Sequence, residues 1–368
     1  MRGTMLKPII IAAGGTGGHL FPAEAVADVL MRRGERVVLM TDARSGAGQS
    51  AVFAGCEQHV IEGAGLAGRS PARVAAGLRQ LARGTKSART LLTTLDAAAV
   101  IGFGGYPSVP PIVATLGLRR RPIVILHDQN AILGGANRML ARIADHLATS
   151  FPKTEAVPRR IKTTLTGNPV RPAVVKLLAA PFVPPAQTID LLVLGGSLGA
   201  RIFASLIPAA LAALPEPLRR RIRLTMQCPQ PEIAAARALL DAAAITNDLA
   251  PFFTDVAPRI AAAHLVIARA GGSTVAELAV IGRPAIFIPL AINADQRHNA
   301  DAIARKGGAI RLDQASLTPP VLARAVETLL AEPGRLAAMA QAAAACGIAD
   351  ASTRLADLVQ SCVAARVS

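Results

Sequence analysis

Aromatic side chains are scarce in this sequence of 368 residues, making up 3% of it, with one tyrosine and no tryptophan. Nucleic-acid-binding modules usually set stacking aromatics among their basic residues, so this scarcity argues against a nucleic-acid partner. Acidic residues are also in deficit, and the formal charge of +16 calls for an anionic partner. A phosphorylated substrate or an anionic membrane surface meets that requirement.

Cysteine and clustered acidic residues are few as well. The four cysteines lie far apart and form no C-x-x-C pair, which excludes a disulfide framework and a zinc site of the usual spacing. No Asp-x-Asp pair and no H-x-x-x-H pair occurs, so we expect neither a metal ion nor another cofactor. The apolar stretch near the N-terminus is too short for a signal peptide, and we expect a cytosolic chain with reduced thiols.

One uncharged run is long enough to span a membrane, "AAAVIGFGGYPSVPPIVATLGL" at 97–118. Three glycines and three prolines in its middle would break a helix there. The run is therefore predicted to form a buried strand, a glycine loop and the start of a helix.

Two stretches share one plan, "KPIIIAAGGTGGHLFPAEAVADVLMRRG" and "IDLLVLGGSLGARIFASLIPAALAALP". Each has a short apolar strand, a G-G-[ST]-x-G loop and an alanine-rich helix. Further apolar strands alternate with helical segments in both halves, which indicates parallel sheets covered on both faces. We predict an α/β chain of two doubly wound domains, 1–168 and 169–349, with a proline-rich linker at 167–187.

Glycine loops between a strand and a helix can hold phosphate, because their amides and the helix N-terminus face the same anion. The first loop lacks the dinucleotide fingerprint, since Leu20 stands where the last glycine belongs, and Asp42 is then expected to be a strand-end residue. A third cluster, "ARAGGSTVAELAVIGRP" at 268–284, leaves two readings open. Either Ser273 and Glu277 form a helix capping box, or the helix start binds a diphosphate while Glu277 binds ribose hydroxyls.

The motifs "GGTGGHLFP", "GFGGYPSVPP", "HDQN", "GNPVR", "GGSLGA", "RAGGSTVAEL" and "DQRHNA" together resemble the MurG family of glycosyltransferases in order and spacing. The resemblance implies a GT-B fold, in which two Rossmann-like domains face each other across a deep cleft and a last helix, about 350–368, packs back on the first domain. The first domain would bind the acceptor and the membrane, and the second the UDP-sugar.

The activity implied by the resemblance is an inverting transfer of N-acetylglucosamine from UDP-N-acetylglucosamine to the C4 hydroxyl of lipid I. The product would be lipid II, a step of peptidoglycan synthesis that supports cell shape and division. The enzyme would be peripheral at the cytoplasmic face of the inner membrane, with anionic lipids as partners. Another GT-B transferase acting on a lipid, a UDP-sugar epimerase of similar fold and a non-catalytic nucleotide-binding module remain alternatives.

The same resemblance implies site residues. His19 is the best candidate for the catalytic base, because an imidazole ordinarily titrates near neutrality. A histidine at a helix start can also serve only to hydrogen-bond the main chain, and this alternative stays open. The acceptor-side loop would hold Gly104, Gly105 and Tyr106. Donor-binding positions would be Thr16, Gly17, Gly18, Asn130, Arg171, Ser197, Phe253, Gly272, Ser273, Thr274, Val275, Ala276, Glu277 and Gln296. The sequence departs from the family pattern at Asp128, where glutamate is common, at Ala294, and at Phe253, where an aliphatic residue is usual.

Residues 73–92 predict a basic amphipathic helix. Its apolar face would hold Val74, Leu78, Leu81, Ala88 and Leu92, flanked by Arg73, Arg79, Arg83, Lys86 and Arg89. Such a helix can lie on an anionic membrane, or it can be a surface helix whose apolar stripe faces the core. The sequence "LRRRP" at 118–122 adds a second basic cluster to the same half.

Overall fold

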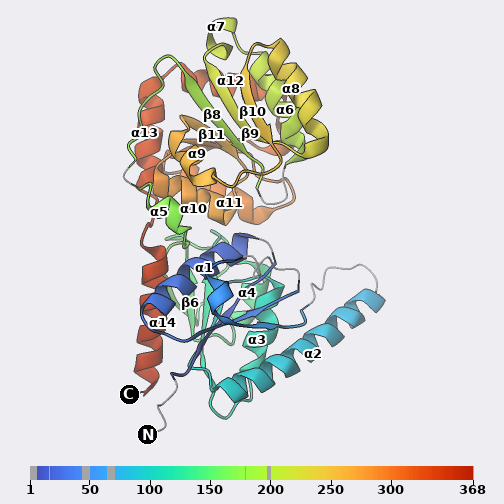
Figure 1. The fold of residues 1–368 in the computed structure, drawn as a ribbon, viewed down its shortest axis with the longest axis vertical. Coiled ribbons are helices and arrows are strands. Elements are labelled where there is room, and N and C mark those ends of the chain that lie inside the picture. The colour runs from blue at the N-terminus through green and yellow to red at the C-terminus, as the bar shows by residue number, and fades with distance from the viewer. Residues whose placement is uncertain are drawn as a thin grey trace. The chain divides into compact units, whose positions relative to one another are not determined.

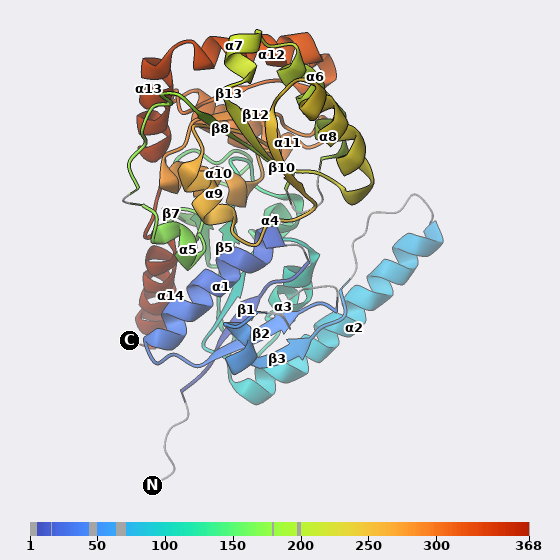
Figure 2. The same cartoon turned by 45° about the horizontal axis from the view of Figure 1, so that its top comes forward.

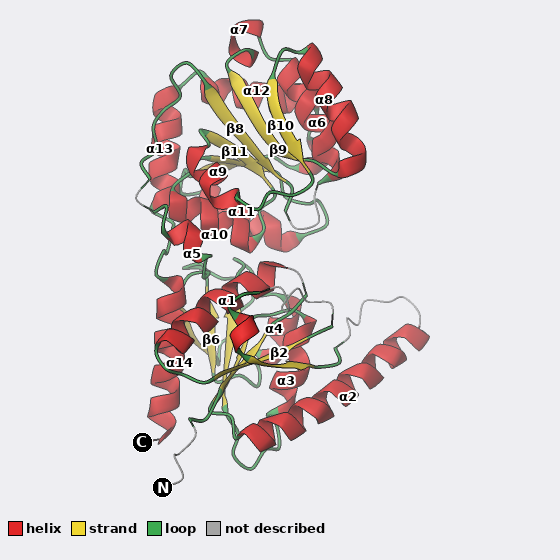
Figure 3. Cartoon of the chain, viewed as in Figure 1, coloured by secondary structure: helices red, strands yellow, loops and turns green. Residues whose placement is uncertain are grey.

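A computed structural model of the chain describes residues 6–15, 17–43, 50–63, 71–178, 180–196 and 200–367. The chain forms two compact units, Met1–Arg171 with Asp350–Ser368, and Pro172–Ala349. We call them the N-terminal unit and the C-terminal unit. Each has a parallel sheet with helices on both faces (Figures 1 and 3). The predicted α/β class with two doubly wound, Rossmann-like units is confirmed.

The N-terminal unit has seven strands in its described part, all parallel and ordered β3-β2-β1-β4-β5-β6-β7. The strands are β1 (Ile9–Ala12), β2 (Val37–Thr41), β3 (Glu57–Val60), β4 (Ala99–Gly102), β5 (Ile123–Asp128), β6 (His146–Thr149) and β7 (Lys162–Leu165). The helices are α1 (Gly17–Arg32), α2 (Pro71–Leu95), α3 (Val109–Ala114), α4 (Gly135–Leu140) and α14 (Ala351–Val367). The 97–118 run thus forms β4, a glycine loop and α3, as predicted.

Strand β1 shows why this sheet needs cover on both faces. Ile9 and Ile11 pack into a core formed with α1 and α14, whereas Ile10 and Ala12 pack into a second core formed with α2, α3 and α4. Side chains alternate between the faces of a strand, so a strand that is apolar at every position must be buried on both sides. Figure 2 shows α1 and α14 side by side, and these two helices contact each other.

The C-terminal unit has six parallel strands among its described residues, ordered β10-β9-β8-β11-β12-β13. The strands are β8 (Ile189–Leu194), β9 (Ile222–Gln227), β10 (Thr246–Ala250), β11 (Leu265–Ala268), β12 (Ala285–Phe287) and β13 (Ala309–Arg311). The helices are α5 (Pro172–Val175), α6 (Arg201–Ala212), α7 (Glu216–Arg219), α8 (Ile233–Ala242), α9 (Val256–Ala262), α10 (Gly272–Ile281), α11 (Ala294–Ala304), α12 (Pro319–Leu330) and α13 (Pro333–Ala344).

The main core of this unit lies between the sheet and the helices α6, α8 and α12. Ile189, Leu191 and Val193 of β8 point into it and are fully buried or nearly so. Helix α9 contacts β8 as well, and α10 contacts both α9 and α11. Because all strands of a unit are parallel, the loops that follow them meet at one edge of the sheet. The glycine loops and the polar motifs therefore gather at the carboxyl edge of each sheet.

Helix α2 is buried on one side only. Ala88 and Leu92 are buried, and a methyl group on Gly84 would lie 1.9 Å from the carbonyl oxygen of Glu62, so the helix needs a glycine there to lie this close to the chain beneath it. Leu78, predicted on the apolar face, is 53% exposed, so the core that covers Ala88 and Leu92 does not cover this residue. Figure 1 shows the N-terminal half of α2 reaching beyond the sheet. Within the described ranges, no helix is long and apolar enough to cross a membrane.

Candidate active site

His19 lies in the first turn of α1 and is half-buried at the carboxyl edge of the N-terminal sheet. Its Nδ1 is 2.8 Å from the carbonyl oxygen of Phe103, and the Gln129 amide nitrogen is 3.4 Å from the same atom. A carbonyl oxygen can only accept, so Nδ1 carries the hydrogen of this bond and Nε2 carries the lone pair of the neutral ring. Nε2 is therefore the nitrogen that can take a proton from a substrate.

The loop that follows β4 packs on the ring of His19. Gly104 and Gly105 have φ of +88° and +69°, a backbone conformation that glycine adopts without strain. A methyl group on Gly105 would lie 3.4 Å from Nε2 of His19, and one on Gly104 would lie 3.4 Å from Cε1. Tyr106 begins the short turn after them and is 42% exposed. The structure thus brings the predicted base and the predicted acceptor loop together.

The carboxylate of Asp128 stabilises the "HDQN" loop through hydrogen bonds. Its carboxylate accepts hydrogen bonds from the amides of Asn130 and Gly134 and from Nδ2 of Asn137. Asn130, predicted to bind the donor, is thereby held through its main chain. His127 beneath this loop is buried, its Nε2 donates to the carbonyl oxygen of Gly167, and burial lowers its pKa to about 4. His127 is therefore a neutral structural residue at physiological pH.

Arg171 lies against the helix that carries His19. Its guanidinium sits 5.2 Å from the ring centroid of Phe21, a cation–π contact. Glu24 lies one turn farther along α1. The charge of Arg171 and a hydrogen bond from Ser50 both lower the pKa of its carboxyl, but burial outweighs them and raises that pKa. Phe21 and Glu24 thus hold the side chain of Arg171 near the carboxyl edge.

The first glycine loop is occupied by a carboxylate. The amide of Gly15 donates to Oδ1 of Asp42 at 3.0 Å, and a methyl group on Gly14 would lie 2.6 Å from the same oxygen. A negative charge at this place repels an anion and takes one of the amides that would bind it. Asp42 is a strand-end residue, as expected. The Gly14–Gly15 part of the loop contacts its carboxylate and is therefore not suited to binding a phosphate. Thr16 lies outside the described residues, and Gly17 and Gly18 begin α1.

The capping-box reading of Glu277 was wrong. Helix α10 begins with Gly271 as its N-cap, and no side chain caps it, so Ser273 is an ordinary residue of the first turn. Glu277 lies in the second turn and is 6% exposed. The amides of Gly272, Ser273 and Thr274 form the first turn of a helix that starts at the carboxyl edge of the sheet. A helix N-terminus without a side-chain cap is suited to binding an anion.

Gln296 lies next to this helix start, in the first turn of α11. Its Oε1 accepts from the amide of Leu290 at 2.9 Å, which leaves the NH₂ group as the part of the side chain that can bind a ligand. Asn293 caps α11 by accepting from the amides of Asp295 and Gln296. Farther along, Asn299 donates to the carbonyl oxygen of Ala270, directly before α10. These bonds bring Gln296 and the Gly272–Glu277 stretch together.

Phe253 follows β10 and is less accessible than expected for a residue that contacts a base. Its side chain is 6% exposed, and the guanidinium of Arg259 lies 4.2 Å from its ring centroid. The neighbouring Phe252 is 70% exposed. A ligand at this segment would meet the main chain of Phe253 or the side chain of Phe252. Ser197, the remaining predicted donor residue, lies outside the described ranges.

Three polar residues at these edges, Arg269, Asn137 and Asn168, were not predicted from the sequence. Arg269 is buried directly before the glycines of α10, where its guanidinium donates to the carbonyl oxygen of Ile288 and burial lowers its pKa. Asn137 and Asn168 are also buried, and Oδ1 of Asn137 and both side-chain polar atoms of Asn168 have no hydrogen-bond partner in the described part of the chain. Arg269 and Asn168 belong to the motifs "RAGGSTVAEL" and "GNPVR", so their place in these motifs could have marked them as candidate site residues.

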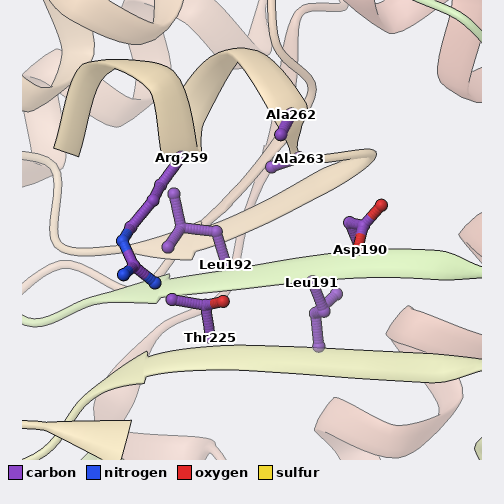
Figure 4. Close-up of a pocket in the computed structure, with 7 residues that line it drawn as sticks. All are labelled: Asp190, Leu191, Leu192, Thr225, Arg259, Ala262 and Ala263. Atoms are coloured by element: carbon purple, nitrogen blue, oxygen red, sulfur yellow. The ribbon is translucent and has the colours of Figure 1, made fainter. Parts of the chain in front are cut away.

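A small pocket of about 80 Å³ lies between α9 and the sheet of the C-terminal unit (Figure 4). Arg259, Ala262 and Ala263 line it from the helix side, and Asp190, Leu191, Leu192 and Thr225 from the strands. None of the predicted site residues lines this pocket. It lies below the carboxyl edge and is separate from the candidate donor site.

The sequence matches two family models, the glycosyltransferase family 28 N-terminal domain over residues 9–149 and the C-terminal domain over residues 190–355. It is 70% identical over 367 residues, covering 100% of both chains, to a protein of Acidiphilium cryptum (strain JF-5). A protein of Granulibacter bethesdensis is 52% identical, over 96% of this chain and 93% of its own. Both are named UDP-N-acetylglucosamine–N-acetylmuramyl-(pentapeptide) pyrophosphoryl-undecaprenol N-acetylglucosamine transferase.

Among solved structures, the chain is similar to the crystal structure of Acinetobacter baumannii MurG. The TM-score is 0.79 at 31% sequence identity, and the match covers 96% of this chain and 99% of that one. Sequence and fold therefore agree over both units.

Proposed function

The chain belongs to glycosyltransferase family 28, and from that membership we propose that it transfers N-acetylglucosamine from UDP-N-acetylglucosamine to the C4 hydroxyl of the muramyl sugar of lipid I. The product is lipid II, and the anomeric centre is inverted. The observation that carries this function is the high identity, along the whole chain, with enzymes that bear this name. As a step of peptidoglycan synthesis, the reaction supports cell shape, cell division and the cell cycle.

The N-terminal unit is proposed to bind the acceptor and activate its hydroxyl. Nε2 of His19 takes the proton of the C4 hydroxyl as the new bond to the anomeric carbon forms. The Phe103 carbonyl oxygen holds Nδ1–H at 2.8 Å, so it fixes the tautomer and stabilises the imidazolium that results. Gly105 lies beside Nε2 in the proposed acceptor-side loop, which also holds Gly104 and Tyr106.

The C-terminal unit is proposed to bind the donor. The first turn of α10 receives the diphosphate, and Glu277 accepts hydrogen bonds from two ribose hydroxyls. The NH₂ group of Gln296 contacts the sugar, and the segment of Phe253 contacts the uracil. The buried charge of Arg269, directly before α10, adds positive potential where the leaving UDP gains negative charge.

Six further residues belong to the donor-binding proposal, namely Thr16, Gly17, Gly18, Asn130, Arg171 and Ser197. Arg171 would stabilise the leaving diphosphate with the help of the α10 N-terminus. We also propose that the reaction uses no metal ion. In support, the sequence has no Asp-x-Asp pair, and the described residues contain no group of three or more His, Cys, Asp or Glu side chains that could hold one.

We place the protein at the cytoplasmic face of the inner membrane as a peripheral protein that binds anionic lipid through α2. Arg79, Arg83 and Lys86 lie on the exposed face of this helix, beside the exposed Leu78. Arg83 also pairs with Glu62 at 3.2 Å, so Arg79 and Lys86 offer the greater share of uncompensated charge. The same basic surface has no stacking aromatics, which fits lipid and not nucleic acid.

Release of UDP tests the function. UDP-N-acetylglucosamine should release UDP only when a lipid I analogue is present, and UDP-glucose and UDP-N-acetylgalactosamine should compete poorly. Conversion of the donor without an acceptor would indicate a UDP-sugar epimerase. Transfer to a different lipid would indicate another transferase of the same fold, and binding of UDP without turnover would indicate a non-catalytic module.

A further inference from the structure

Arg283 is a buried arginine just past the C-terminal end of α10, the end away from the proposed donor site. Its side chain is 3% exposed, and it follows Gly282, which ends the helix in the left-handed conformation. Burial lowers the pKa of its guanidinium. Arg283 forms no ion pair with a carboxylate of the described residues, and its guanidinium donates hydrogen bonds to main-chain carbonyl oxygens. A buried charge requires such compensation, so these carbonyl oxygens must stay in place around it.

These oxygens belong to the C-terminal ends of two helices. Ala261 of α9 accepts from Nη2 at 2.6 Å and from Nε at 3.0 Å, and Ile281 and Gly282 of α10 accept from Nη1 at 3.1 Å each. The last carbonyl groups of a helix lack partners inside the helix and carry partial negative charge. One guanidinium therefore caps α9 and α10 together and holds their C-terminal ends at a set distance.

The other ends of the same two helices lead to the proposed donor site. Helix α9 directly follows the segment that carries Phe253, and α10 begins with the Gly272–Glu277 stretch. The ten residues of α10 span about 15 Å, so a small tilt at the Arg283 end shifts the donor-binding end. The packing of α9 against α10 thus sets the separation between the uracil and diphosphate subsites.

Arg283 also holds the chain that enters the C-terminal unit. Its Nη2 is 3.4 Å from the carbonyl oxygens of Ala180 and Pro181, and its guanidinium lies 5.6 Å from the ring centroid of Phe182. A second arginine holds the next part of the same stretch, since Arg221 donates to the carbonyl oxygens of residues 186 and 187. The hydrogen bonds of Arg221 in the described chain involve neither α9 nor α10, which makes it a matched control.

Building on the proposed donor site, we infer that Arg283 is a positioning residue for the UDP part of the donor. It holds α9 and α10 at the spacing at which the Phe253 segment and the Gly272–Glu277 stretch bind one nucleotide together. It touches neither substrate.

The test is Arg283→Lys, because the single ammonium group keeps the charge but cannot span the carbonyl groups of both helices. We expect the KM for UDP-N-acetylglucosamine and the Kd for UDP to rise about tenfold, while kcat and the KM for a lipid I analogue stay within about twofold. Arg221→Lys loosens the same connecting stretch and should leave the KM for the donor unchanged. The melting temperatures of both variants are measured in parallel.

A lower melting temperature with an unchanged donor KM and UDP Kd in Arg283→Lys would overturn the proposal and make Arg283 a stabilising residue only. An equal rise of the donor KM in Arg221→Lys would overturn it too, since the connecting stretch would then be the cause. If Arg283→Lys does not fold, Phe182→Leu decides by the same measurement, with an unchanged donor KM as the contrary result. A wild-type protein that binds no UDP would instead refute the proposed function.

Discussion

Replacing Gly105 by alanine tests whether Nε2 of His19 is the base. The new methyl group would lie 3.4 Å from Nε2 and from Cδ2 of His19. An acceptor oxygen must come within about 2.6–3.2 Å of Nε2 to give up its proton, so the methyl group occupies part of that approach. Gly105 has φ of +69° and ψ of 178°, a region that glycine alone adopts readily, so a side chain there adds a strain of about 1–3 kcal/mol.

Gly104→Ala is the matched control. Its φ of +88° is also unfavourable for a residue with a side chain, but its methyl group lies 3.4 Å from Cε1 and 3.5 Å from Nδ1 of His19. Nδ1 is already bonded to Phe103 and takes no part in the proton transfer. The two variants should therefore differ in catalysis, and their melting temperatures show how much stability each loses.

Loss of general base catalysis lowers turnover about 10²- to 10⁴-fold, and we expect a fall of this size in kcat for Gly105→Ala and for His19→Ala. For Gly104→Ala we expect a fall of no more than about tenfold, because the base stays accessible. The assay is UDP release at saturating donor and lipid I analogue, with UDP affinity and melting temperature measured alongside. Equal losses of kcat in the two glycine variants, or near wild-type turnover in His19→Ala, would refute the assignment.

Three other predictions address donor, membrane and pH. Glu277→Ala should raise the Kd for UDP at least about a hundredfold in calorimetry, because it removes two charge-assisted bonds to ribose hydroxyls, each of which contributes about 1.5–3 kcal/mol. An unchanged Kd would leave Glu277 a structural role only. Replacing Arg79, Arg83 and Lys86 by glutamine should sharply reduce sedimentation with anionic vesicles at low salt, since each basic residue near the surface contributes about 1 kcal/mol to membrane binding. Vesicle binding that is insensitive to salt and to these changes would contradict the proposed docking of α2. The pKa of about 4 for His127 lies below its unfolded value, so the stability that depends on a neutral His127 is present above pH 6.5 and is lost as the pH falls towards 4. The free energy of unfolding should drop by about 3 kcal/mol over this range, and His127→Gln should flatten that dependence. An unaltered pH dependence in the variant would refute this prediction.

Much of the fold could be predicted from local pattern. The short apolar strands at 9–12 and 189–194 are each followed by a glycine loop and an alanine-rich helix. The first is apolar at every position and the second at every position except Asp190, which indicates parallel sheets covered on both faces. The motifs that follow the strands also place the candidate site at the carboxyl edges, since parallel strands end at one edge. These inferences need only the chain's own periodicity.

The roles of single side chains depended on contacts between distant segments. Asp42 closes the first glycine loop from 27 residues away, and the tautomer of His19 is set by Phe103, 84 residues farther along the chain. Leu78 and Leu92 look alike in the pattern of α2, yet Leu92 is buried in the core and Leu78, in the N-terminal half of the helix, is 53% exposed. Periodicity says that a helix has an apolar side but not how far the neighbouring sheet extends beneath it.

The sequence by itself therefore determined the class of fold, the two-unit plan and the motifs that identify the family, because these depend on residue order and spacing. Only the tertiary structure decided which amides remain for an anion, which nitrogen of His19 can accept a proton, and which arginine is buried among helix ends. Each of these depends on which hydrogen-bond donor meets which acceptor across the fold. Nothing in the sequence distinguishes Arg283 from other arginines, because its partners in α9, in α10 and at Ala180, about a hundred residues before it, meet it only in the folded chain.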